Sequence, residues 1–178
     1  MVPSHPTMVL LNFINMYLNT YSFLGESLVF PGKKVAVGSD DLYPVVDFVI
    51  EYLKSKGFEV IPVGSAKTRK PEPWPLVGYE VGRLVASGVV DWGIVICFTG
   101  TGVSIAANKV KGVRAALCVD AETAKGSRLW NDANVLVLSG RLTTSYTAKE
   151  IIDAWLSITT PDESEQSNIN LLKILDRM

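Results

Sequence analysis

The chain has 178 residues, of which 48% are hydrophobic and 20% charged, and its formal net charge is −1. This length suits a single domain with a substantial core, and the balanced charge argues against a nucleic-acid-binding surface. The only basic cluster, Lys67 to Lys70, is short and followed by prolines, which is typical of a solvated loop.

Residues 1–31 are interpreted as an N-terminal extension of an α/β domain that covers residues 32–178 and ends in a C-terminal helix. Between Met8 and Leu24, apolar residues alternate with asparagines at roughly helical spacing, which predicts an amphipathic helix. This segment lacks the basic region of a signal peptide and is too interrupted to cross a bilayer. It packs on the domain, packs on a partner subunit, or results from an upstream start codon, and the sequence leaves the three possibilities open.

From Lys33 onward, short apolar runs alternate with helical patterns. The predicted strands are residues 33–38, 58–63, 92–97, 113–118 and 134–138, and the predicted helices are residues 45–56, 76–87, 103–109, 121–130 and 144–156. Asp40 or Asp41 is the expected N-cap of the first helix, and residues 64–75, with three prolines, are expected to form a loop. Continuous apolar strands are typical of a parallel sheet covered on both faces. The alternation predicts a three-layer αβα sandwich with a five-stranded parallel sheet, doubly wound and Rossmann-like.

Ligands of doubly wound sheets bind at the carboxyl ends of the strands. This rule selects residues 38–41, 97–104, 118–120 and 139–141, which we expect to line one crevice. The two cysteines, Cys97 and Cys118, both end apolar runs and are expected to be thiols in a reducing compartment, so a cytoplasmic protein is predicted. No Cys/His cluster has the spacing of metal ligands, and His5 is the only histidine.

The most informative segment begins at Cys97, where a strand enters a turn with Gly100 and Gly102 and a predicted helix follows. Glycines allow close approach of backbone to ligand, and the amides of a helix N-terminus attract an anion, either a phosphate or a developing oxyanion. Cys97 is interpreted in two ways. It is a small buried hydrophobe, or it is a thiolate, favoured by the helix dipole, that takes a proton next to a substrate carbonyl.

Several separated motifs resemble the type B ribose-5-phosphate isomerase family, which includes the galactose-6-phosphate isomerase subunits. The motifs are Gly38-Ser39-Asp40, Ile96-Cys97 with Thr99-Gly100-Thr101-Gly102, Ser104 to Lys109, Arg114-Ala115-Ala116, and Asn131 to Val135 with Gly140-Arg141. The resemblance covers roughly residues 33–156. It implies an αβα fold with a five-stranded parallel sheet, and dimers or tetramers whose active sites are shared between subunits, with no metal or organic cofactor.

The same resemblance implies roles for individual residues. Cys97 matches the base that moves a proton between C1 and C2 of the sugar. Asp40 matches a substrate-binding aspartate, Asn131 an asparagine that reaches the substrate from the neighbouring subunit, and Arg141 a phosphate-binding arginine. The expected anion hole consists of the Thr99 side chain with the backbone amides of Gly100, Thr101, Gly102, Val103 and Ser104.

The chain also departs from the family pattern. Asp41 stands where the family has a histidine, Trp130 replaces the histidine that opens the sugar ring, and Phe98 replaces a glycine. The tail over residues 159–167 is polar and acidic instead of basic. Asp41 and Trp130 are still expected to line the substrate pocket, and Trp130 is interpreted either as a stacking surface for a sugar or as packing.

Two hypotheses follow from the sequence. The first is an aldose–ketose isomerase that acts on a sugar or sugar phosphate through an enediolate, with Cys97 as base. Its substrate is a pentose phosphate, a sugar phosphate of another size, or a sugar that is already open-chain. The second is a non-catalytic sugar-binding homologue or a partner subunit of a hetero-oligomer. A nucleotide-binding module is disfavoured, because both the Gly-x-Gly-x-x-Gly and the P-loop patterns are missing.

Overall fold

The computed structural model describes residue 30 and residues 32–176. The predicted extension therefore lies almost wholly outside the described residues, as does His5. Within the described part of the chain, no helix is long and apolar enough to cross a membrane.

Five strands form one parallel sheet in the order β2-β1-β3-β5-β4. The strands are β1 (Lys34–Ser39), β2 (Glu59–Gly64), β3 (Trp92–Cys97), β4 (Ala115–Leu117) and β5 (Val135–Ser139). All six residues of β3, which lies in the middle of the sheet, are buried. The predicted sheet is confirmed, and its central strand delivers Cys97 to the carboxyl edge.

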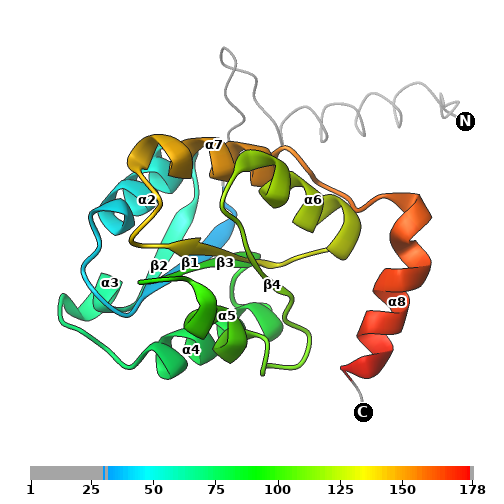
Figure 1. Cartoon of the computed structure of the whole chain (residues 1–178), viewed down its shortest axis with the longest axis horizontal. Helices are drawn as coiled ribbons and strands as arrows, with labels where there is room; N and C mark the ends of the chain where they lie inside the picture. The colour runs from blue at the N-terminus through cyan, green and yellow to red at the C-terminus, as the bar shows by residue number, and fades with distance from the viewer. Residues whose placement is uncertain (1–29, 31, 177–178) are drawn as a thin grey trace, which may run out of the picture.

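The helices lie in two layers (Figure 1). Helices α2 (Pro44–Ser55), α6 (Ala121–Asn131) and α7 (Ser145–Leu156) cover one face, and α4 (Trp74–Ala86) and α5 (Thr101–Ala107) cover the other. Alternate residues of each strand point to opposite faces. Ile94 and Ile96 accordingly belong to the core under α2 and α7, whereas Val95 and Cys97 belong to the core under α4 and α5. The three-layer αβα sandwich is confirmed.

Three local predictions are wrong. The predicted loop over residues 64–75 contains the short helix α3 (Ser65–Thr68) and the first residues of α4. Strand β4 has three residues instead of six, since it is an edge strand paired only with β5. Neither Asp40 nor Asp41 caps α2, because the helix begins at Pro44, whose ring fixes a helical φ, and Tyr43 occupies the N-cap position.

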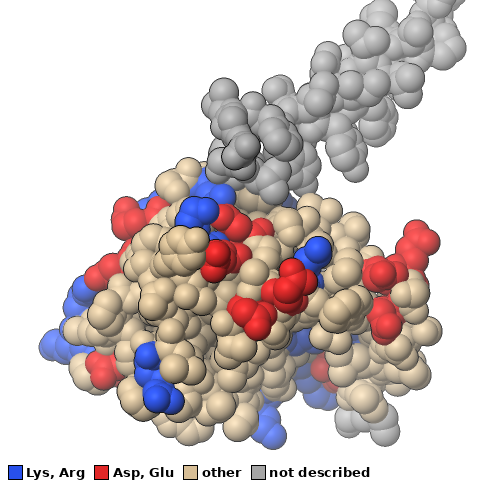
Figure 2. All heavy atoms as spheres, turned by 45° about the horizontal axis from the view of Figure 1, so that its top comes forward, with Lys and Arg blue, Asp and Glu red and all other residues tan. Residues whose placement is uncertain are grey.

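The chain ends, within the described residues, in a 3-10 turn (Glu163–Glu165) and helix α8 (Gln166–Leu175), which stands beside the sandwich in Figure 1. On the face formed by α2, α6 and α7, acidic and basic side chains are interspersed (Figure 2). Several of these charges form exposed ion pairs, such as Lys149 with Asp153 at 2.8 Å. Exposed pairs of this kind add little to stability.

Candidate active site

Cys97 is the last residue of β3, and its side chain is only 5% exposed. The neighbouring strands continue into loops that hold it in place. The Cys97 carbonyl accepts a hydrogen bond from the Gly140 amide at 2.8 Å, and the preceding Ile96 carbonyl accepts one from the Asp40 amide at 3.4 Å. The ends of β1, β3 and β5 therefore meet at Cys97, as the rule for doubly wound sheets predicts.

The turn after Cys97 depends on its glycines. Gly100 has a φ of 82°, and a Cβ there would lie 2.5 Å from the Leu117 side chain. Only glycine fits both the conformation and the space. The Thr99 and Thr101 hydroxyls lie 2.7 Å apart and share a hydrogen bond across the turn.

Helix α5 begins directly after this turn. The Ser104 amide donates to the Gly100 carbonyl at 3.2 Å, which is the first bond of the helix. The amides of Thr101, Gly102 and Val103 come before this bond and have no acceptor within the helix. These three N–H groups are available for an anion next to the Cys97 thiol, whereas the Val103 side chain belongs to the core.

The loop after β1 carries Asp40 and Asp41. The Asp41 carbonyl accepts hydrogen bonds from the Ser39 hydroxyl at 2.7 Å and the Ser65 hydroxyl at 2.8 Å, which fixes the loop against α3. The Asp41 carboxylate is exposed and accepts a bond from the Leu42 amide. Asp40 is half-buried, and burial raises its pKa although a hydrogen bond from Tyr43 opposes the shift.

Tyr43 is a residue of this edge that the sequence analysis did not identify. Its hydroxyl donates to Asp40 Oδ1 at 3.1 Å, and its ring lies against Gly140, where a Cβ would be 2.4 Å from Tyr43 Cγ. Burial raises the pKa of Tyr43, and the charge of Asp40, the hydrogen bond to it and the neighbouring acidic groups add to the shift, so that Tyr43 stays a neutral phenol. The only signal in the sequence was its place between Asp41 and the helix-starting Pro44.

Arg141 and Phe98 lie on the β5 side of the same edge. The Arg141 amide donates to the Phe98 carbonyl at 3.1 Å, and its guanidinium stands 5.8 Å from the centre of the Phe98 ring. Large apolar side chains surround this part of the edge and remain 44–60% exposed, namely Leu42, Trp74, Phe98 and Leu142. Exposed apolar side chains gathered at one edge, here called the apolar rim, are typical of an interaction surface.

The structure does not bring Trp130 and Asn131 to Cys97 of the same chain. Helix α6 starts at the carboxyl edge and runs back, so that both residues lie beside the beginning of β4, where the Asn134 amide donates to the Arg114 carbonyl. The Trp130 ring packs on Gly126 and is 55% exposed. Any contact of these two residues with Cys97 therefore requires a second chain.

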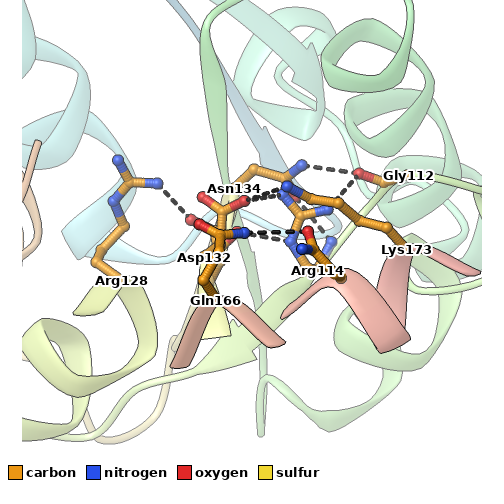
Figure 3. A network of polar contacts seen from close by, with 9 residues as sticks. Gly112, Arg114, Arg128, Asp132, Asn134, Gln166 and Lys173 are labelled. Carbon is orange, nitrogen blue, oxygen red and sulfur yellow. Dashed lines mark hydrogen bonds and ion pairs between the residues drawn. The ribbon is translucent and has the colours of Figure 1, made fainter. Parts of the chain in front are cut away.

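A polar network fixes the corner after Asn131 (Figure 3). Asp132 adopts a left-handed conformation with a φ of 51°. Arg114 holds it by donating to the Asp132 carbonyl at 2.7 Å and pairing with its carboxylate at 3.0 Å, and Lys173 of α8 lies 3.5 Å from the same carboxylate. Asn131, Arg114 and α8 line a groove of about 430 Å³. The corner is thus a rigid platform that presents Asn131 outward.

The second cysteine differs from Cys97 in its surroundings. Cys118 is fully buried beside Ser127, and burial raises the pKa of its thiol to about 11. Among the described residues, no group of three His, Cys, Asp or Glu side chains is placed to hold a metal ion. The chemistry available at the carboxyl edge is thus that of a thiol, a carboxyl, a phenol and backbone amides.

Comparison with known proteins identifies the class to which this fold and site belong. The family model described as Ribose/Galactose Isomerase matches residues 35–173. The chain therefore belongs to the ribose/galactose isomerase family, as its resemblance predicted.

Individual relatives agree with this assignment. The chain is 36% identical over 146 residues to ribose-5-phosphate isomerase B of Escherichia coli, covering 82% of this chain and 97% of the relative. It is 37% identical over 123 residues to D-erythrulose-4-phosphate isomerase of Pectobacterium atrosepticum, covering 68% of this chain and 81% of the relative. The solved structure of Clostridium thermocellum ribose-5-phosphate isomerase B superposes with a TM-score of 0.76 at 37% identity, covering 81% of this chain and 97% of that one.

Proposed function

We propose that this chain is an aldose–ketose isomerase that interconverts a sugar phosphate through an enediolate. The observation that carries the proposal is the position of Cys97, at the end of the central strand and beside the free amides of Thr101, Gly102 and Val103. Membership of the ribose/galactose isomerase family supports the same reaction class.

The proposed chemistry needs few groups. The Cys97 thiolate takes the proton from the carbon next to the carbonyl, and the electron pair of that C–H bond moves into the enediolate. The amides of the turn and the Thr99 hydroxyl stabilise the negative oxygen that forms. Cys97 then returns the proton to the neighbouring carbon. Each step uses groups of the chain itself.

The substrate contacts are assigned to the loops around Cys97. Asp40 accepts a hydrogen bond from a sugar hydroxyl, while the Arg141 guanidinium, exposed at the end of β5, binds the phosphate. Asp41 follows Asp40 in the same loop, and its exposed carboxylate is assigned to the outer side of the substrate site. A pentose phosphate and a four-carbon sugar phosphate both remain candidate substrates. Relatives of this chain include enzymes named for each kind.

We further propose that the active protein is a homodimer or homotetramer in the cytoplasm, with active sites shared between chains. The apolar rim of Leu42, Trp74, Phe98 and Leu142 surrounds the site and is exposed in a single chain. Trp130 and Asn131 lie too far from Cys97 of their own chain to contribute to its site. A second copy placed on the rim covers the apolar surface and supplies Asn131.

The alternative function is sugar binding without turnover, as a homologue or partner subunit. It is favoured by Trp130, which occupies the position of the ring-opening histidine in the family pattern. A cyclic sugar phosphate would then bind but stay closed. A four-carbon substrate with a terminal phosphate is open-chain and needs no such step, which reconciles Trp130 with catalysis.

The test is proton NMR of the purified full chain in D₂O with aldose and ketose phosphates of four to six carbons. An isomerase incorporates deuterium next to the carbonyl and converts one sugar into the other. Cys97→Ala should abolish both signals, whereas the matched control Cys118→Ala, which alters the other buried thiol, should retain them. Binding of a sugar phosphate without exchange by the wild-type chain would establish the alternative function instead.

A further inference from the structure

Tyr43 spans the end of the central strand. Its hydroxyl bonds to Asp40, which follows β1, and its ring lies on Gly140, which follows β5. Strand β3 lies between these two strands and ends at Cys97. The backbones of Asp40 and Gly140 are themselves bonded to Ile96 and Cys97. Tyr43 therefore bridges the two loops that flank the carboxyl end of β3, the strand that ends at Cys97, and it packs on the core under α2 and α7.

An aldose–ketose isomerisation moves two protons. One moves between carbons C1 and C2, which is the task of Cys97. The other moves from the oxygen on C2 to the oxygen on C1, and a thiol occupied with the carbon-bound proton does not supply this transfer. A hydroxyl hydrogen-bonded to a carboxyl is suited to it, because the hydroxyl accepts one proton while it passes its own to the carboxylate.

We propose that Tyr43 and Asp40 form a proton relay that transfers the hydroxyl proton between the two substrate oxygens. This inference rests on the proposed isomerase function. As Cys97 returns its proton to C1, the hydroxyl on C2 gives its proton to the Tyr43 oxygen, the Tyr43 proton passes to the Asp40 carboxylate, and the C2 carbonyl forms. The relay then runs in reverse and protonates the oxygen on C1. No proton is gained or lost overall, and every group returns to its starting state.

The electrostatics of the loop suit this role. The surroundings that raise the pKa of Tyr43 keep it a neutral phenol, which both donates and accepts. Burial also raises the pKa of Asp40, so that its carboxylate is a stronger proton acceptor than an exposed one. The acidic groups acting on the phenol are Asp40, Asp41 and Cys97, and all of them disfavour its ionisation, while Asp41 also acts on Asp40.

Two rates distinguish the relay from a purely structural role of Tyr43, namely the rate of deuterium exchange at the substrate carbon and the rate of conversion of one sugar into the other. In D₂O, deuterium wash-in at the substrate carbon requires Cys97 alone, while conversion also requires the oxygen-to-oxygen transfer. Tyr43→Phe keeps the ring on Gly140 and removes only the hydroxyl. We expect the conversion rate to fall about 10²-fold while deuterium wash-in persists, so that the ratio of exchange to conversion rises. A loss of packing would lower both rates together and leave this ratio unchanged.

Tyr52→Phe is the matched control, because the Tyr52 hydroxyl also bonds to a carboxylate, Asp153, at 2.6 Å, on the helices remote from Cys97. Its exchange and conversion should equal those of the wild type. Asp40→Asn provides a second variant. If Tyr43 and Asp40 act as one unit, the double variant Tyr43→Phe/Asp40→Asn should convert the sugar no more slowly than the slower of the two single variants.

The outcomes separate the two proposals. A wild-type enzyme that turns over, with an unchanged exchange-to-conversion ratio in Tyr43→Phe, overturns the relay and leaves the isomerase intact. A wild-type chain that shows neither exchange nor conversion with any sugar phosphate overturns the isomerase and the relay with it. A raised ratio confined to the Tyr43 and Asp40 variants establishes the relay.

Discussion

Gly140→Ala is the substitution whose effect the structure defines most sharply. The backbone of Gly140 has no positive φ, so alanine meets no conformational penalty. The added Cβ would nevertheless lie 2.4, 2.6 and 2.7 Å from three ring carbons of Tyr43, distances that packed atoms do not reach. The ring of Tyr43 must therefore move, and its hydrogen bond to Asp40 must break.

The cost follows from the two contacts that are lost. A hydrogen bond to a carboxylate contributes about 1.5–3 kcal/mol, and repacking an overfilled site costs roughly 1–3 kcal/mol. A loss of about 3 kcal/mol corresponds to a decrease in Tm of roughly 6–12 °C for a protein of this size. Turnover should fall as well, since the Tyr43 hydroxyl is displaced from Asp40.

Thermal unfolding measures the first effect, and the NMR assay measures the second. The decisive comparison introduces Gly140→Ala into a Tyr43→Ala background, where no ring remains to be displaced. In that background Gly140→Ala should change Tm by less than about 1 °C. Its effect in the wild type comes from the contact with the Tyr43 ring, and substitutions at residues in contact are not additive. An equal decrease in both backgrounds would refute the contact between Tyr43 and Gly140 as the cause.

Two further predictions concern the charges of the described domain and its assembly. Burial alone would raise the pKa of Asp153, yet hydrogen bonds from Lys149, Tyr52 and Lys56 hold it below its usual value. Its stabilising effect is therefore full above the unfolded pKa of about 3.9 and is lost as the pH falls toward the folded pKa. Asp153→Asn should lower Tm at pH 7, and melting curves of the two proteins should converge below about pH 4; a constant difference would exclude this linkage. The second prediction concerns shared sites, and it is tested by unfolding equal amounts of inactive Cys97→Ala and Asn131→Ala chains together and reassembling them. If each site takes Cys97 from one chain and Asn131 from the other, about half of the dimers are mixed and each has one intact site, so about a quarter of the wild-type activity should return. If each site is complete within one chain, no activity should return.

Much of the fold could be predicted because its strands are continuous apolar runs. Strand β3 is buried along its whole length, and its sequence is correspondingly uninterrupted. The edge strand β4 was predicted too long, because the apolar residues Val113 and Cys118 flank it on either side outside the ladder. Pairing with a single neighbour, a tertiary property, sets its length. The helix α3 was missed because it is a single turn packed under the β1 and β2 loops.

The candidate site was predictable where one segment of sequence forms it. The turn from Cys97 to Gly102 carries its glycines and its helix start within a few residues. Tyr43 gave no such signal, because its contact with Gly140 joins residues far apart in the chain. Trp130 and Asn131 could be named from the resemblance, which also implies that Asn131 serves a neighbouring subunit. The direction of α6 agrees with that implication, because it carries both residues away from their own Cys97.

The contact between the Tyr43 ring and Gly140 also distinguishes this site from the sequence pattern of the family that the chain resembles. Gly140 belongs to the matched motif, whereas Tyr43 is a bulky residue in the loop after Asp40. A side chain at position 140 would have excluded the ring, so the glycine is what permits Tyr43 to reach across β3. The phenol then bonds to Asp40 at the end of β1, in a chain whose only histidine, His5, lies outside the family match at residues 35–173. In the proposed relay, proton transfer between the substrate oxygens therefore depends on hydroxyl and carboxyl groups at this edge, and the bond between Tyr43 and Asp40 connects them.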